Sequence, residues 1–224
     1  MKIEVLTLFP KMFECLNESV IGKAILAEKF KLNVTDIRDF SLDKHKKCDD
    51  YPFGGGSGMV MTPQPICDAI DNVDPNRLCK RIFLSPKGET LSQSLVEQLS
   101  KEENLLFLCG HYEGVDQRVI DSEIDMELSI GDYVLTGGEL ACMVAIDAIA
   151  RYIDGVLGSS DSTNEESFSN GLLEYPQYTR PQNFRGMLVP DVLLSGNHQE
   201  VDKWRYNEQL RITKERRPDL LEEK

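Results

Sequence analysis

Three loops of the sequence combine glycine with polar side chains, and each follows an apolar run typical of a buried strand. They are residues 85–88 (SPKG), 110–114 (GHYEG) and 130–138 (IGDYVLTGG). Ligands of open parallel sheets bind outside the carboxyl ends of the strands, and glycine lets backbone groups approach a ligand closely. Each loop alone is equally well explained as an ordinary tight turn. The three together favour a cradle that holds an adenosine group by backbone contacts.

Other glycine patterns point away from the common nucleotide-binding enzymes. The run GGGSG at residues 54–58 follows a polar segment instead of a strand and does not match GxGxxG. The pattern GxxxxGK[ST] does not occur in the chain. The sequence therefore disfavours dinucleotide-dependent oxidoreductases and P-loop nucleotide hydrolases.

The elements that must position the three loops alternate along the chain. Apolar runs predict strands at residues 3–8, 32–37, 81–84, 105–109 and 124–128. Helical spacing predicts helices at residues 17–30, 63–73, 92–101, 115–122 and 138–153. Strands that alternate with helices imply an α/β fold with a mostly parallel sheet covered on both faces.

The last quarter of the chain has a different character. Residues 161–170 belong to a polar segment typical of a flexible linker. Prolines and an amphipathic helix around residues 200–210 are expected to follow it. The sequence thus predicts one domain over residues 1–160, a flexible linker over 161–170 and a small helical domain over 171–224.

Charge is distributed unevenly along the chain. The net charge is −13, and residues 171–224 carry nine basic and nine acidic side chains, so the whole excess of acid falls in residues 1–170. Phosphates are bound by Lys and Arg. A polyanion would therefore be bound by local clusters of basic side chains and not by the electrostatic field of the whole chain.

The cysteines and the amino terminus indicate an ordinary cytoplasmic protein. The six cysteines form no CxxC pair, so we expect reduced, mostly buried thiols and no metal site built from thiolates. The first residues lack the apolar region of a signal peptide. No apolar run approaches the roughly 18–20 residues of a membrane span, so we expect no membrane partner.

Five longer runs carry a resemblance to a known family. They are DDYPFGGGSGM (49–59), CGHYEG (109–114), SIGDYVLTGGEL (129–140), YTRP (178–181) and VPDVLLSGNH (189–198). With these motifs in order, the chain resembles the bacterial tRNA (guanine-N1)-methyltransferase family from Met1 to about Leu221. The resemblance implies transfer of a methyl group from S-adenosylmethionine to N1 of guanosine 37 in tRNA, next to the anticodon.

The resemblance also implies an architecture that strand prediction alone does not give. It implies a SPOUT-type parallel sheet with a deep trefoil knot, although knots are nearly absent from proteins in general. A small helical C-terminal domain that binds the tRNA would follow. The family is homodimeric, with the active site at the subunit interface.

The resemblance assigns cofactor-binding residues to the three loops. The positions that match the S-adenosylmethionine-binding loops of the family are Ser85, Pro86, Gly110, Tyr112, Glu113, Ile130, Gly131, Asp132, Tyr133, Val134, Leu135, Gly137 and Gly138. The backbone contacts of the family agree with the glycine pattern of these loops.

Two further residues receive catalytic roles from the resemblance. Guanine N1 carries a proton, so a general base must remove it, and a fixed cation should stabilise the negative charge that builds on O6. Arg151 matches the catalytic arginine of the family, and Glu166 matches its general base. The chain departs from the family pattern at Glu166, where Asp is more usual, and also at Ser57 and Tyr51.

Candidate RNA contacts are found in both parts of the chain. Lys44 and His45 belong to the dense basic cluster at residues 44–47, and Arg180, His198 and Arg205 belong to the C-terminal part. Basic clusters are often merely solvated, and the single Trp204 is expected to lie in a core. The family depends on Mg²⁺, but no carboxylate cluster of the sequence marks a dedicated protein site for it.

Three alternatives remain open from the sequence. One is a related knotted methyltransferase that acts on another RNA or another atom, which the run at 189–198 and the Arg151/Glu166 pair disfavour. Another is a non-catalytic RNA-binding module that keeps the cofactor pocket, which only the Glu at 166 favours. The third is an enzyme of small nucleotides, which the negative charge would suit and which predicts no affinity for tRNA.

Overall fold

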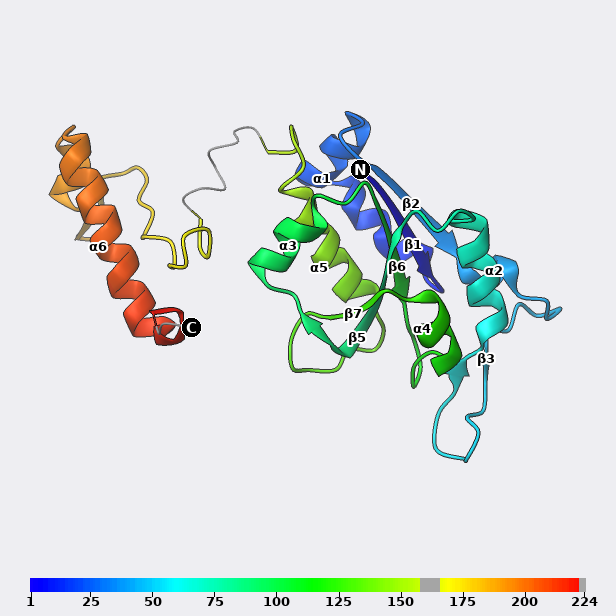
Figure 1. The fold of residues 1–224 in the computed structure, drawn as a ribbon. Helices are drawn as coiled ribbons and strands as arrows, with labels where there is room; N and C mark the ends of the chain where they lie inside the picture. Colours follow the sequence, from blue (N-terminus) through cyan, green and yellow to red (C-terminus); the bar gives the residue numbers. More distant parts are fainter. Residues whose placement is uncertain (158–165, 222–224) are drawn as a thin grey trace. The chain divides into compact units, whose positions relative to one another are not determined.

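A computed structural model describes residues 1–157 and 166–221 of the chain (Figure 1). The chain divides into two compact units, Met1–Gly158 and Ser159–Lys224. Residues 161–165 of the predicted linker lie outside the described residues. Among the helices of the described part, none is long and apolar enough to cross a membrane.

The first unit is built on a five-stranded sheet with the strand order β2-β1-β6-β5-β7. Its strands are β1 (Lys2–Thr7), β2 (Lys31–Asp36), β5 (Lys80–Thr90), β6 (Asn104–Cys109) and β7 (Met126–Ser129). Every neighbouring pair is parallel, so the prediction of an α/β fold with a parallel sheet is confirmed. A separate antiparallel pair is formed by β3 (Asp49–Asp50) and β4 (Val60–Met61).

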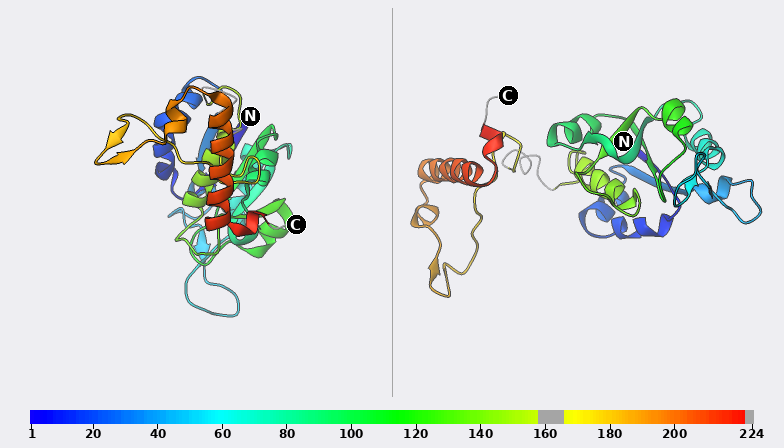
Figure 2. Two further views of the ribbon diagram at one scale, coloured as in Figure 1. Left: turned by 90° about the vertical axis from the view of Figure 1, so that its left-hand side faces the viewer. Right: turned by 90° about the horizontal axis from the view of Figure 1, so that it is seen from below.

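Helices pack on both faces of this sheet, as Figures 1 and 2 show. The helices are α1 (Ser19–Leu26), α2 (Pro63–Val73), α3 (Gln93–Leu99), α4 (Gln117–Glu123) and α5 (Glu139–Ala150), with 3-10 helices η1 (Pro10–Asn17) and η2 (Ile37–Phe40). Strand β6 explains the two layers, because side chains alternate between the faces of a strand. Leu105 and Phe107 join a core with α1, α3 and α5, whereas Leu106 and Leu108 join a core with α2 and α4.

Strand β5 extends beyond the predicted residues 81–84. Its pairing with β7 shifts register between Leu84 and Glu89, so residues 85–88 bulge out before the strand resumes. A Cβ on Gly88 would lie 2.3 Å from the carbonyl carbon of Glu127 in β7. The bulge can therefore pass this close to β7 only with glycine at position 88.

The second unit consists of one long helix and short elements. They are β8 (Asn183–Phe184), β9 (Met187–Leu188), η4 (Asp191–Leu194), α6 (His198–Arg216) and η5 (Pro218–Leu221). The side chain of Asn197 caps α6 by accepting a hydrogen bond from the N–H of Glu200. The helix expected at 200–210 is thus longer, and its two buried residues, Gln209 and Thr213, are polar.

A buried ion pair joins α2 and α4 to the start of β5. Arg81 and Asp74 are each only 3 % exposed, with 2.9 Å between Nε and Oδ2. The Arg81 guanidinium also donates a hydrogen bond to the carboxylate of Glu123. The other oxygen of Asp74 accepts the N–H of Leu78 at 2.7 Å. Every charge in this cluster is thus engaged by a partner.

We predict that Asp74→Ala lowers the free energy of unfolding by about 3–5 kcal/mol, because it leaves the Arg81 charge buried without its closest partner. Arg77 offers a matched control, since its guanidinium is 52 % exposed and pairs with Glu123 and Asp125 at 3.7 and 3.4 Å. Arg77→Ala should cost less than about 1 kcal/mol. Urea denaturation followed by circular dichroism measures both, and equal losses would contradict the interpretation.

Candidate functional site

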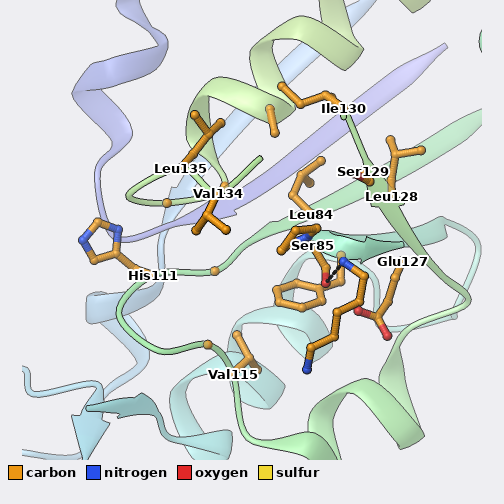
Figure 3. A pocket seen from close by; sticks show the side chains of 18 of the residues that line it. Leu84, Ser85, His111, Val115, Glu127, Leu128, Ser129, Ile130, Val134 and Leu135 are labelled. Atoms are coloured by element: carbon orange, nitrogen blue, oxygen red, sulfur yellow. Dashed lines mark hydrogen bonds between the residues drawn. The ribbon is translucent and has the colours of Figure 1, made fainter. Parts of the chain in front are cut away.

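A cavity of about 320 Å³ opens where the three glycine-containing loops meet. Residues 85–88 bulge from β5, and the other two loops follow β6 and β7; the three strands are neighbours in the sheet, so their carboxyl-terminal parts bring the loops together. Figure 3 shows Ser85, Val115 and Val134 around the same space, although they come from different loops. This is the position at which ligands of open α/β sheets bind.

Nearly all of the sequence-predicted cofactor residues line this cavity. They are Ser85, Pro86, Gly110, Tyr112, Glu113, Ile130, Gly131, Tyr133, Val134, Leu135, Gly137 and Gly138. Asp132 is not among the lining residues. Lys87, His111 and Glu127 also line the cavity and were missed by sequence analysis. Their only signal in the sequence is that each lies in or directly before one of the loops.

The loops after β6 and β7 are held together by their backbones. The N–H of Gly138 donates to the carbonyl of Gly110 at 2.8 Å, and His111 and Gly137 form an isolated antiparallel bridge. A Cβ on Gly138 would lie 3.0 Å from Cα of Cys109 and 3.1 Å from N of Gly110. These backbone atoms cannot move aside as easily as a flexible side chain, so a side chain at position 138 would push the two loops apart by a few tenths of an ångström.

The other loops are fixed by local hydrogen bonds. The hydroxyl of Ser85 accepts the N–H of Lys87 at 3.2 Å (Figure 3). The hydroxyl of Ser129 bonds to both N and O of Gly131, at 3.2 and 3.1 Å. Tyr112 has a φ of 59°, an unusual backbone conformation for a residue with a side chain. These contacts give the cavity a preformed wall.

A buried thiol lies directly before the loop that follows β6. Cys109 ends β6 directly before Gly110 and is fully buried. Burial, together with a hydrogen bond to the Cys142 thiol, raises the pKa of Cys109 well above its ordinary value. This thiol therefore stays protonated at neutral pH and adds no negative charge beside the loop that begins at Gly110.

The two predicted catalytic residues belong to different units. Arg151 follows the last turn of α5, and its N–H donates to the carbonyl of Asp147 at 3.4 Å. Glu166 lies in the second unit, where its carbonyl accepts the N–H and the hydroxyl of Ser169, at 3.2 and 2.7 Å. The backbone of Glu166 is thus fixed by a turn.

The predicted RNA contacts are divided between the units. Lys44 and His45 lie in the loop after η2, where the N–H of His45 donates to the carboxylate of Asp43 at 2.7 Å. In the second unit, Arg180 precedes the cis peptide bond to Pro181, and His198 begins α6. The remaining residue is Arg205, whose guanidinium carbon lies 4.9 Å from the centre of the Tyr175 ring.

Two further expectations concern Trp204 and metal ions. Trp204 is half-buried instead of lying in a core, and its ring centre is 6.3 Å from that of Tyr178. Within residues 1–157 and 166–221, no group of three or more His, Cys, Asp or Glu residues is placed to hold a metal ion.

Comparison with known proteins gives a match over almost the whole chain. Residues 1–223 match the model of a family described as tRNA (Guanine-1)-methyltransferase TrmD. Similar curated proteins, named tRNA (guanine-N(1)-)-methyltransferase, come from Clostridium botulinum strain 657, Clostridium novyi strain NT and Clostridium tetani strain Massachusetts. They are 59, 57 and 56% identical to this chain, respectively, over 98–100% of its length and 92% of their own.

We predict that Gly138→Ala weakens binding of S-adenosylmethionine at least about tenfold, because the added methyl group separates loops that must touch to shape the cavity. Isothermal titration calorimetry measures the affinity. Ser57→Ala serves as control, since Ser57 is exposed and does not line the cavity, and its affinity should equal that of the wild type. Undiminished binding by Gly138→Ala would show that the loop contact does not shape the site.

Proposed function

The chain belongs to the tRNA (guanine-1)-methyltransferase family, and we propose that it transfers a methyl group from S-adenosylmethionine to N1 of guanosine 37 in tRNA. The cavity between the bulge of β5 and the loops after β6 and β7 carries this proposal, because two of the family motifs, at 109–114 and 129–140, contribute much of its lining. The competing interpretation as an enzyme of small nucleotides leaves the second unit without a role.

The cavity fits the adenosine part of the cofactor. Its volume of about 320 Å³ falls in the range of about 300–1,000 Å³ typical of small-molecule sites. Glycines at positions 110, 137 and 138 line the cavity without side chains, so an adenosine could approach the backbone closely there, and we assign adenosine recognition to this part of the lining. When bound, the cofactor supplies an electrophilic methyl group on its sulfonium. We assign the thirteen residues named in the sequence analysis to cofactor binding, with Asp132 in a supporting position outside the lining.

Glu166 and Arg151 have complementary tasks in the proposed reaction. The carboxylate of Glu166 takes the proton from guanine N1, which frees the nitrogen lone pair to form a bond to the methyl carbon. The guanidinium of Arg151 stabilises the negative charge that spreads onto O6 as the proton leaves. Glutamate keeps the carboxylate of the usual aspartate and adds one methylene, which its turn with Ser169 must accommodate.

We further propose that the enzyme is a homodimer in which Arg151 and Glu166 of different subunits share one site. Exposed apolar side chains support such an interface, because large exposed apolar patches commonly mark protein contacts. Met12 of η1 and Leu140 and Val144 of α5 are such residues. The knot of the parallel sheet and the tRNA-binding role of residues 171–224 belong to the same proposal.

The tRNA would be held by local cations, since the chain as a whole is acidic. We assign RNA contacts to Lys44, His45, Arg180, His198 and Arg205. Phosphate contacts position a nucleic acid but carry no sequence information, so selection of guanosine would fall to the catalytic residues. A Mg²⁺ ion would act without a dedicated protein site.

Transfer of a labelled methyl group tests the reaction. Wild type should methylate a tRNA transcript with G at position 37 and not the same transcript with A there. Glu166→Gln should lower the rate constant about 10²–10⁴-fold, because an amide cannot accept the N1 proton. Glu165→Gln is the matched control and should retain activity. A wild type that binds both cofactor and tRNA but methylates neither transcript would favour a non-catalytic RNA-binding module.

Mixed dimers test whether the two catalytic residues come from different subunits. Arg151→Ala and Glu166→Gln chains would be co-expressed with different tags, and the mixed dimer isolated by both. A site shared between subunits leaves one of two sites intact, so the mixed dimer should regain about half of the wild-type activity. If both residues come from the same chain, the mixed dimer will be as inactive as each variant alone.

A further inference from the structure

A second cavity, of about 410 Å³, lies beside the first one. Its lining residues are Arg38, Asp43, His45, Lys46, Lys47, Cys48, Asp49 and Tyr112. Tyr112 also lines the cavity of the three loops, so one side chain is shared by the two cavities. The lining carries three permanent cations and two carboxylates, whereas the chain as a whole carries a net charge of −13. The second cavity is therefore more positive than the protein as a whole.

We propose that this second cavity binds a backbone phosphate of the tRNA strand that carries the target guanosine, with Arg38 and Lys47 as its ligands. The inference rests on the proposed function, and it goes beyond it by assigning a phosphate subsite to Lys47 of the basic cluster and to Arg38, which the sequence analysis did not single out. Arg and Lys are the side chains that bind phosphodiesters, and arginine can do so with two parallel hydrogen bonds.

Two of the charged side chains of the cavity are occupied by other groups. The side chain of Asp43 accepts the backbone N–H groups of His45 and Lys47, at 2.7 and 3.3 Å. These hydrogen bonds lower the pKa of Asp43, so it remains an anion that holds the turn. Lys46 is engaged by Asp39, 2.6 Å from its ammonium group. The cavity therefore has a fixed loop and at least one cation that is already neutralised.

Arg38 and Lys47 are held less tightly by acids. The ammonium group of Lys47 lies 3.8 Å from Asp50, and both side chains are at least half exposed. Such a pair contributes little and is easily exchanged for another anion. Within the described part of the chain, Arg38 has no carboxylate within ion-pair distance of its guanidinium. That group instead stacks at 5.5 Å over the ring of Phe9, which leaves its N–H donors open to a phosphate.

A row of rings connects this cation to the loop of the first cavity. The ring of Phe9 lies 4.8 Å from that of His111, and His111 lies 5.0 Å from the ring of Tyr112. His111 and Tyr112 both line the first cavity. A phosphate bound at Arg38 would thus be held at a set distance from the methyl donor. The consequence is that the second cavity would fix which nucleotide of the strand reaches the reaction site.

The test combines charge-neutral variants with charge-neutral RNA. Binding of a tRNA anticodon-arm transcript would be measured by fluorescence anisotropy over a range of salt concentrations. For Arg38→Gln/Lys47→Gln, the slope of log affinity against log salt should become shallower by about 0.7–1 unit, the value for one lost phosphate contact. Arg38→Lys should keep the wild-type slope. The affinity for S-adenosylmethionine should stay unchanged in all variants.

A second arm locates the phosphate. Single methylphosphonate linkages, which carry no charge, would be placed one at a time around nucleotide 37. One linkage should weaken binding to the wild type at least about tenfold but cause no further loss in Arg38→Gln/Lys47→Gln, because a contact cannot be lost twice. Lys101→Gln, an exposed lysine outside both cavities, controls for net charge and should respond to that linkage as the wild type does.

Two results would overturn the proposal. One is a salt slope of the double variant equal to that of the wild type. The other is that every methylphosphonate linkage weakens binding of Arg38→Gln/Lys47→Gln by the same factor as it weakens binding of the wild type. That result would mean that the cavity binds only free anions or only supports the loop. Because binding is measured without turnover, a wild type that binds tRNA with the expected pattern but transfers no methyl group would refute only the proposed function.

Discussion

The contact between the backbones of Gly138 and Gly110 is the constraint on which the first cavity depends. It joins the loop after β7 to the loop after β6 with a hydrogen bond of 2.8 Å, and it places backbone atoms 3.0–3.1 Å from where a Cβ at position 138 would lie. The parallel sheet brings the loops to one edge, and this contact, together with the bridge between His111 and Gly137, joins two of them. Preorganisation of this kind reduces the entropy that a ligand must lose on binding, and it allows the cavity to be formed mainly by main-chain groups.

Electrostatics is arranged locally in this acidic protein. Basic side chains gather in the loop after η2, and the Cys109 thiol at the end of β6 stays neutral because it is buried. Long-range repulsion of a polyanion is screened within about 8–10 Å at ordinary ionic strength. A few fixed cations can therefore act on RNA at short range while the rest of the surface repels it. Because of this distribution of charges, RNA would bind less tightly elsewhere on the protein than at these cations.

Much of the first unit could be predicted from the sequence, because its signals are local. The continuous apolar run at 105–109 predicts a buried strand, and the glycines at 110, 137 and 138 predict loops that a ligand can approach. Strand β5 was predicted too short because its pairing resumes after a polar bulge at 85–88, and no local pattern reports such tertiary pairing. The participation of Lys87, His111 and Glu127 in the cavity depends likewise on which loops become neighbours. Trp204 was expected in a core, yet the buried residues of α6 are Gln209 and Thr213.

The polar packing of α6 has a consequence for how this protein can change over time. Thr213 accepts the N–H of Leu173 at 2.8 Å, which links α6 to the segment before it, and donates within the helix to the carbonyl of Gln209 at 2.7 Å. Surface substitutions usually change stability by less than about 0.5 kcal/mol, so most positions of α6 are open to mutational drift. The two apolar cores of the first unit allow no such freedom. Lineages could thus retune the helical surface to a changing partner while the sheet and its loops stay constant.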